Sequence, residues 1–154
     1  SSSQVDILDK NLKVIKTNRG GKITYHGPGQ KVAYFVLNLN NREKNIRKLV
    51  KKIERCIISV LDEYGIKAYA DRKNIGIWIG KEKPKKVAAI GVKVKKWIAY
   101  HGFSLNISND LLKYKKINPC GIQDKEMTNL KEIKKDNYNN ISKIITKKFL
   151  NIFL

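Results

Sequence analysis

Twelve residues near the start of the chain, 19–30 (RGGKITYHGPGQ), constrain its fold more than any other segment. They contain four of the ten glycines, one of the three prolines and one of the two histidines of this 154-residue chain. Neither an amphipathic helix nor a regular strand requires that composition, whereas glycine permits positive φ angles and a close approach of the backbone. We therefore expect a short extended piece, ITYH, between two tight turns, with backbone N–H groups that face a ligand.

The length and composition are those of one globular domain. A chain of 154 residues can bury a substantial core, and 42% apolar with 30% charged residues is typical of soluble proteins. No apolar run is long enough to span a bilayer, and the polar start SSSQ is not followed by the apolar region of a signal peptide. Cys56 and Cys120 provide neither a disulfide framework nor the spacing of a metal site, so we expect a reducing compartment and no bound metal.

The formal charge of +20 favours a partner that carries negative charge, such as nucleic acid, an anionic membrane or an acidic protein. Of the 33 basic residues 28 are lysines, and asparagine and isoleucine are also abundant, as an AT-rich genome would encode. Codon bias therefore competes with function as the origin of the charge. Proteins that recognise specific bases rely on arginine, of which this chain has few.

The order of apolar patterns predicts an α/β (α+β) domain in which helices pack on a mixed β-sheet. After an extended arm with a weak strand at 13–16, we expect strands at 31–39, 66–70, 75–79, 87–94 and 97–107. We expect helices at 43–64, at 109–114 with Ser108 as its cap, near 128, and at 139–153.

The predicted helix at 43–64 carries apolar residues at helical spacing and is expected to end at Gly65. Asn40 and Asn41 are candidates for its N-terminal cap. Cys56 lies on the apolar stripe, so we interpret it as a small core residue and not as a reactive thiol.

Three kinds of residue capable of chemistry stand in unusual surroundings. His26 and His101 each precede a glycine, and Cys120 lies on a predicted turn between proline and glycine. Lys86 directly precedes the small-residue strand VAAIG, and a lysine beside Cys120 would favour the nucleophilic thiolate. Taken singly, each has a plainer interpretation: an inert turn cysteine, a solvated lysine and loop histidines.

Four segments together resemble the signature of the lipoyl(octanoyl) transferases: RGG-x-x-TYHGPGQ at 19–30, KVAAIGV at 86–92, HGFSLN at 101–106 and INPCG at 117–121. They follow the family's order and similar spacing, and the resemblance covers roughly residues 14–130. It implies the fold of the biotin and lipoate protein ligase catalytic domains. It also implies transfer of an octanoyl group from acyl carrier protein to a lysine of a lipoyl-accepting domain, as in 2-oxoacid dehydrogenases or the glycine-cleavage H protein.

The resemblance assigns roles to particular residues. It implies that Cys120 forms the acyl-thioester and that Lys86 lowers the pKa of its thiol, while Lys85 points to the opposite face of the strand. It implies no metal and no cofactor, because the thioester donor is already activated. The substrate-binding residues implied in the same way are Arg19, Gly20, Gly21, Lys22, Ile23, Thr24, Tyr25, His26, Ala89, Ile90, Gly91, Gly102, Phe103 and Ser104.

One departure from the family concerns the start of the chain. Only eighteen residues precede the first motif, where the family has several dozen. We expect a single domain over 1–154 that lacks the family's N-terminal portion, with an incomplete pocket wall or an exposed apolar patch. The octanoyltransferase interpretation also implies cytoplasm in a bacterium, or a mitochondrion or plastid in a eukaryote.

Three alternatives remain beside it. The first is an ATP-dependent lipoate or biotin protein ligase, which would not need the cysteine. The second is a basic nucleic-acid-binding module, which would leave the Gly-rich and Pro-Cys-Gly segments unexplained. The third is an inactive relative that only binds.

Overall fold

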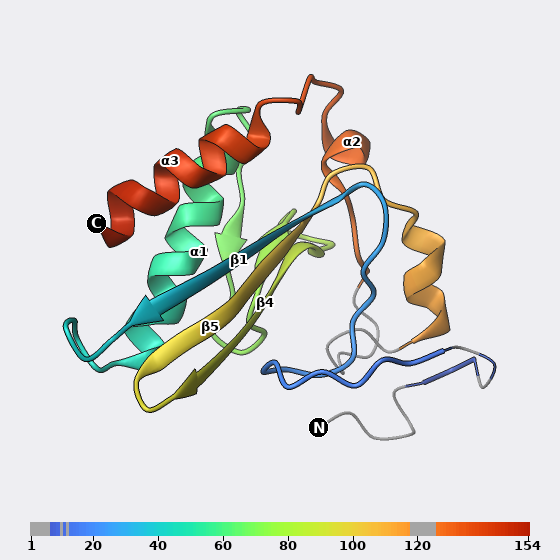
Figure 1. Ribbon diagram of the computed structural model, residues 1–154. Helices are drawn as coiled ribbons and strands as arrows, with labels where there is room; N and C mark the ends of the chain where they lie inside the picture. The colour runs from blue at the N-terminus through green and yellow to red at the C-terminus, as the bar shows by residue number, and fades with distance from the viewer. Residues whose placement is uncertain (1–6, 10, 12, 118–125) are drawn as a thin grey trace.

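The computed structural model describes residues 7–9, 11, 13–117 and 126–154. Five strands form one sheet in the order β1-β5-β4-β3-β2, and helices α1 and α3 cover one of its faces (Figure 1). The elements, in chain order, are β1 (Gln30–Asn38), α1 (Ile46–Asp62), β2 (Tyr69–Ala70), β3 (Ile77–Ile79), β4 (Lys85–Lys95), β5 (Ile98–Asn106), the 3₁₀ helix η2 (Leu111–Lys116), α2 (Leu130–Ile133) and α3 (Ile141–Phe153).

The strand pairings confirm the predicted α+β class. All four pairings between named strands are antiparallel, and a parallel bridge joins Lys86 to Met127 at the margin of the sheet. Strands β4 and β5 form a hairpin whose two turn residues, Lys96 and Trp97, have φ angles of 49° and 61°. Positive φ at both positions is the geometry of a tight two-residue hairpin turn, and it fixes the long β4–β5 register.

Helix α1 forms where the apolar periodicity predicts it, but its cap differs from the expectation. The Asn45 side chain accepts a hydrogen bond from the Lys48 backbone N–H at 3.0 Å, so Asn45 and not Asn40 or Asn41 begins the helix. Asn40 instead lies in a turn in which its N–H bonds the Asn38 side chain. Gly65 ends the segment as predicted, with φ +67° and its N–H bonded to the Asp62 carbonyl.

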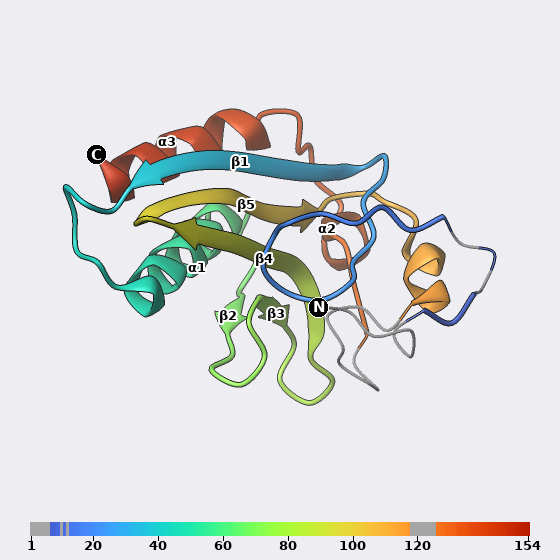
Figure 2. The ribbon, with the colours of Figure 1, turned by 60° about the horizontal axis from the view of Figure 1, so that its bottom comes forward.

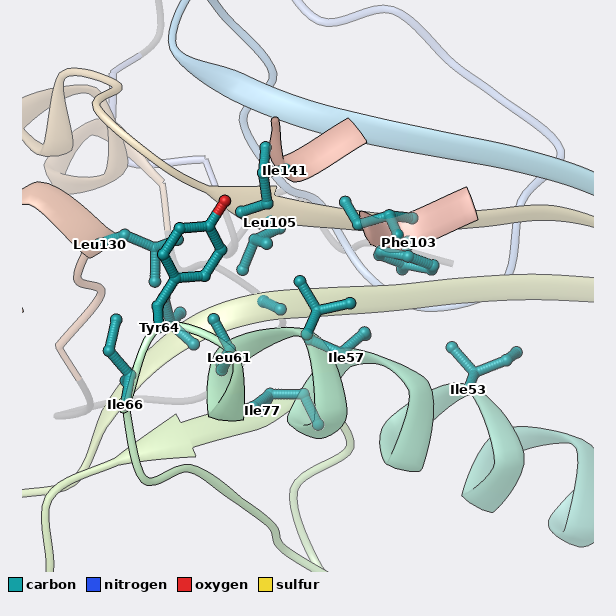
Figure 3. Close-up of a cluster of buried hydrophobic side chains, with 14 of the residues drawn as sticks. Ile53, Ile57, Leu61, Tyr64, Ile66, Ile77, Phe103, Leu105, Leu130 and Ile141 are labelled. Carbon is teal, nitrogen blue, oxygen red and sulfur yellow. The ribbon is translucent and has the colours of Figure 1, made fainter. Parts of the chain in front are cut away.

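The hydrophobic core fills the space between the sheet and its helices (Figure 3). Ile53, Ile57 and Leu61 of α1 face Phe103 and Leu105 of β5, and all five are buried. Each such side chain contributes about 1.5–3 kcal/mol by leaving water. Leu130 of α2 and Ile141 of α3 extend the same core toward the end of the chain.

Two further local expectations are corrected by the structure. The segment 13–16 forms no strand. Asp110, not Ser108, caps η2, because its carboxylate accepts from the Leu112 N–H at 3.0 Å. The short helix expected near 128 is confirmed as α2, which begins at Leu130 after Asn129, whose side chain accepts from the Glu132 N–H.

The N-terminal arm, residues 13–29, crosses the face of the sheet that the long helices leave open (Figure 2). Ile23 of the arm forms a second small apolar cluster with Tyr114 and Ile117, separate from the main core. Within the described residues, no helix combines the length and apolarity needed to cross a membrane.

Candidate active site

A β-bulge determines which way Lys86 points. On β3 and β4, Ile77 pairs with Ala88 while the next residue, Trp78, pairs with Lys86, so Val87 is an extra residue on β4. Val87 and Ala88 are both buried in the main core. Strict alternation would place Lys86 on the same side as Ala88, but the bulge turns it to the open face of the sheet, where Trp78 lies.

The Lys86 side chain is held in a closely fitting site. Only 2% of the residue is exposed, its Nζ donates a hydrogen bond to the Ile75 carbonyl at 2.8 Å, and it lies 5.5 Å from the centre of the Trp78 ring. Gly76, with φ +139°, lies directly beneath it: a Cβ there would be 2.7 Å from the Ala88 carbonyl oxygen and 3.0 Å from Lys86 Nζ. Glycine is required at this position both for its φ angle and for the space.

The loop before β3 is organised so that it presents the Ile75 carbonyl. Asp71 accepts hydrogen bonds from the Lys73 N–H at 2.8 Å and from Asn74 Nδ2 at 2.9 Å. The Trp78 indole N–H donates to the Asn74 carbonyl at 2.9 Å. Local hydrogen bonds within 71–78 therefore position the carbonyl that accepts from Lys86 Nζ.

Lys85 and Lys86 have opposite surroundings, in agreement with the predicted alternation of their side chains. Lys85 faces solvent and pairs with Glu126 at 2.8 Å. The hydrogen bond between them raises the pKa of Lys85 and lowers the pKa of Glu126. Glu126 also accepts a hydrogen bond from the Lys86 N–H through its carbonyl, and the Thr128 N–H donates to the Lys86 carbonyl, both at 2.9 Å.

Cys120, the predicted nucleophile, lies outside the described residues, as do the rest of 118–125. The description resumes at Glu126, and residues 126–128 lie beside Lys86, with Met127 opposite it in the parallel bridge. Cys56, in contrast, is buried in the core, where burial raises the pKa of its thiol to about 11. That environment confirms its interpretation as an unreactive core residue.

Several predicted substrate-binding residues come together on the open face. Gly91 of β4 pairs with Gly102 of β5, and a Cβ on Gly91 would lie 3.1 Å from the Gly20 carbonyl oxygen and 3.3 Å from Arg19 Cδ. The arm therefore rests directly on Gly91. His101 Nε2 lies 2.7 Å from Asn18 Oδ1 and secures the arm beside it.

The other predicted residues of β4 and β5 divide between the two faces. Ala89 pairs with Ser104, next to the glycine pair. The side chains of Ile90 and Phe103 pack with the main core, so only their backbone is available to a ligand on the open face.

The remaining residues of the arm extend away from that pair. Gly21, with φ +87°, and Lys22 are exposed at the turn, and His26 is exposed beside Gln30, 3.1 Å from its Oε1. Ile23 and Tyr25 belong to the second apolar cluster. Thr24 Oγ1 is shielded from solvent without a hydrogen-bond partner within the described part of the chain.

Gln30, Asn106 and Tyr114 form a polar network that the sequence analysis did not select. Gln30 Nε2 lies 2.8 Å from both Asn106 Oδ1 and Tyr114 Oη, and Asn106 Nδ2 donates to the Thr128 carbonyl at 3.0 Å. Gln30 is the last residue of the motif at 19–30, and Asn106 is the last residue of the motif at 101–106. Their place in these motifs was the one sequence feature that could have marked them as site residues. Gly76, which packs against Lys86, lies outside the four motifs, so the sequence did not mark it as a site residue.

The described residues offer no obvious metal site. No group of three or more His, Cys, Asp or Glu side chains that could hold an ion occurs among them. Two hollows of about 490 and 170 Å³ lie along α3 and between α3 and β1, and no predicted site residue lines either of them.

Two solved structures with this architecture are a lipoate protein ligase and a biotin protein ligase. A bipartite lipoate protein ligase from Thermoplasma acidophilum superposes with a TM-score of 0.70 at 14% identity, covering 88% of this chain and 55% of that one. Biotin protein ligase from Aquifex aeolicus gives 0.61 at 20% identity, covering 80% and 52%. The chain therefore has the fold of the lipoate and biotin protein ligases.

Sequence comparison identifies the family within that fold. The model of the lipoyl protein ligase A/B catalytic domain matches residues 3–150, and the chain belongs to this family. An octanoyltransferase of Rickettsia peacockii (strain Rustic) is 47% identical over 127 residues, or 80% of this chain and 61% of the relative. One of Ehrlichia canis (strain Jake) is 45% identical over 152 residues, or 96% and 71%. The chain thus spans 61% to 71% of the length of these relatives.

Proposed function

We propose that this domain transfers an octanoyl group from acyl carrier protein to a lysine of a lipoyl-accepting domain, with Cys120 as nucleophile and Lys86 as its proton partner. The observation that carries the proposal is the burial of Lys86 on the same sheet face as the Gly-rich segments. A lysine 2% exposed, held by a backbone carbonyl and by Trp78, is no solvated surface group. The names of the relatives support the same activity.

The proposed reaction has two steps. The Cys120 thiolate attacks the carbonyl carbon of the octanoyl thioester, a new C–S bond forms, and the carrier's thiolate leaves and takes up the proton that Lys86 received from Cys120. The acceptor amine then attacks the enzyme thioester, an amide C–N bond forms, and the Cys120 thiolate departs. Lys86 accepts the proton that the amine loses.

The open face supplies further groups for this chemistry. Backbone N–H groups near Gly91 are candidates for stabilising the oxyanion. The absence of side chains at Gly20 and Gly91 lets the arm pack closely against β4 beside the proposed site. The charge of +20 would steer an acidic carrier protein toward the domain.

The donor, the acceptor and the cellular location are parts of the same proposal. Acyl carrier protein as donor and lipoyl domains as acceptors follow from the proposed activity. A bacterial source, like that of the relatives named above, would place this activity in the cytoplasm, and a eukaryotic source in a mitochondrion or plastid.

Incubation with octanoyl-carrier protein in the absence of ATP tests the proposal, with intact mass spectrometry as the readout. We expect an octanoyl adduct on the wild type and on Cys56→Ala, but none on Cys120→Ala. Lys86→Met should slow adduct formation by about 100-fold or more, and the matched variant Lys85→Met by less than about twofold. Strict dependence on ATP with free octanoate would instead assign the ligase activity.

A further inference from the structure

We propose that Gln30 and Asn106 are positioning residues that fix the N-terminal arm relative to the Lys86 strand. Together with Tyr114 and Thr128 they form what we call the amide relay. The proposal rests on the proposed function, because it concerns how the arm and Lys86 are kept in register for acyl transfer. Gln30 and Asn106 would act at a distance. In the described part of the chain, neither forms a hydrogen bond to Lys86 Nζ or to the pair Gly91–Gly102.

Gln30 holds the arm at its C-terminal end. Its Nε2 donates to the Tyr25 carbonyl at 3.1 Å, and its Oε1 accepts from the Gly27 N–H at 3.2 Å. The same amide reaches Asn106 and Tyr114, whose hydroxyl donates to Asn106 Oδ1 at 3.1 Å. One side chain therefore fixes the backbone on both sides of His26 and ties it to the end of β5.

Asn106 continues the relay to Lys86. It is 1% exposed, and its Nδ2 donates to the Thr128 carbonyl at 3.0 Å. Thr128 in turn donates its N–H to the Lys86 carbonyl at 2.9 Å. The hydrogen bonds thus run without interruption from Tyr25 in the arm to the backbone of Lys86.

The chemistry of amides explains why these residue types are needed. An amide side chain carries both a donor NH₂ group and an acceptor oxygen, so it can bind a backbone carbonyl on one segment and a backbone N–H on another. In a buried site a single missing partner leaves the other members unsatisfied, which makes such a network respond as a unit. A displacement of about 1 Å at a catalytic group can cost about 100-fold in rate, so the relay has a functional consequence beyond stability.

Hydrogen exchange measured by mass spectrometry tests the coupling directly, without any assay of transfer. Gln30→Met keeps the length of the side chain and removes its hydrogen bonds. We expect exchange about 5- to 10-fold faster both in 23–27 and in 126–129, at the far end of the relay. Tyr114→Phe should produce the same pattern more weakly, and it serves if Gln30→Met does not fold. The matched control Asn151→Leu, an exposed asparagine on α3, should change neither segment.

Octanoyl transfer by the same variants tests the functional part. We expect kcat/KM to fall about 10- to 100-fold in Gln30→Met and to stay within about twofold in Asn151→Leu. Faster exchange confined to residues next to the substitution, or full transfer by a folded Gln30→Met, overturns the proposal. An inactive wild type would instead refute the proposed function, while the exchange data would still decide whether the relay exists.

Discussion

Replacing Gly76 by alanine tests whether the site around Lys86 depends on that glycine. The new Cβ would collide with the Lys86 side chain and lie 2.7 Å from the Ala88 carbonyl oxygen, and the φ of +139° is unfavourable for any residue with a Cβ. The left-handed backbone costs about 1–2 kcal/mol, and loss of the buried hydrogen bond from Lys86 to Ile75 costs about 1.5–3 kcal/mol more. We expect the free energy of unfolding to fall by about 2.5–5 kcal/mol and transfer to slow by about 100-fold.

Gly65→Ala is the matched control. Gly65 also has positive φ, +67°, but the nearest atom to its added Cβ is Lys134 Nζ at 3.5 Å. This variant carries the backbone strain without the collision, so urea denaturation should show a loss of only about 1–2 kcal/mol, with transfer unchanged. Equal losses of stability in the two variants, with normal transfer by Gly76→Ala, would refute the role assigned to Gly76.

Three other predictions concern stability and association. The pKa of Cys56 is raised from 9.0 to about 11, so the folded protein keeps a proton that the unfolded chain loses. The free energy of unfolding should therefore decline by up to about 3 kcal/mol as the pH rises from about 9 to about 11. Urea denaturation at several pH values should show a weaker dependence of this free energy on pH for Cys56→Ala, and an equal dependence in both proteins would contradict the reasoning. Asn45→Ala should cost about 1 kcal/mol in the same assay, because α1 loses its cap, and an unchanged midpoint would argue against that cap. Val36 is 74% exposed on β1, which pairs with β5 alone among the described strands. We expect this edge to pair between copies at high concentration in sedimentation experiments and Val36→Lys to stay monomeric; equal sedimentation of the two proteins would contradict this.

Local sequence patterns were sufficient for most of the secondary structure. The apolar spacing of α1 and the stop at Gly65 involve neighbours within one or two helical turns, so sequence alone predicts them. Strands β4 and β5 also formed close to their predicted limits. The caps were less predictable, since several asparagines near 40–45 compete and the choice depends on where the chain leaves β1.

The sequence by itself determined the family, the candidate residues Lys86 and Cys120, and the α+β class. The tertiary structure decided how Lys86 is presented, because the bulge at Val87 exists only in the pairing of β3 with β4. It also revealed the amide relay, in which Gln30 meets Asn106 and Tyr114 across 76 and 84 residues of sequence. No periodicity encodes contacts of that separation: they arise when the sheet brings the ends of β1 and β5 together, so that the buried Asn106 amide finds its partners in Gln30 and Tyr114.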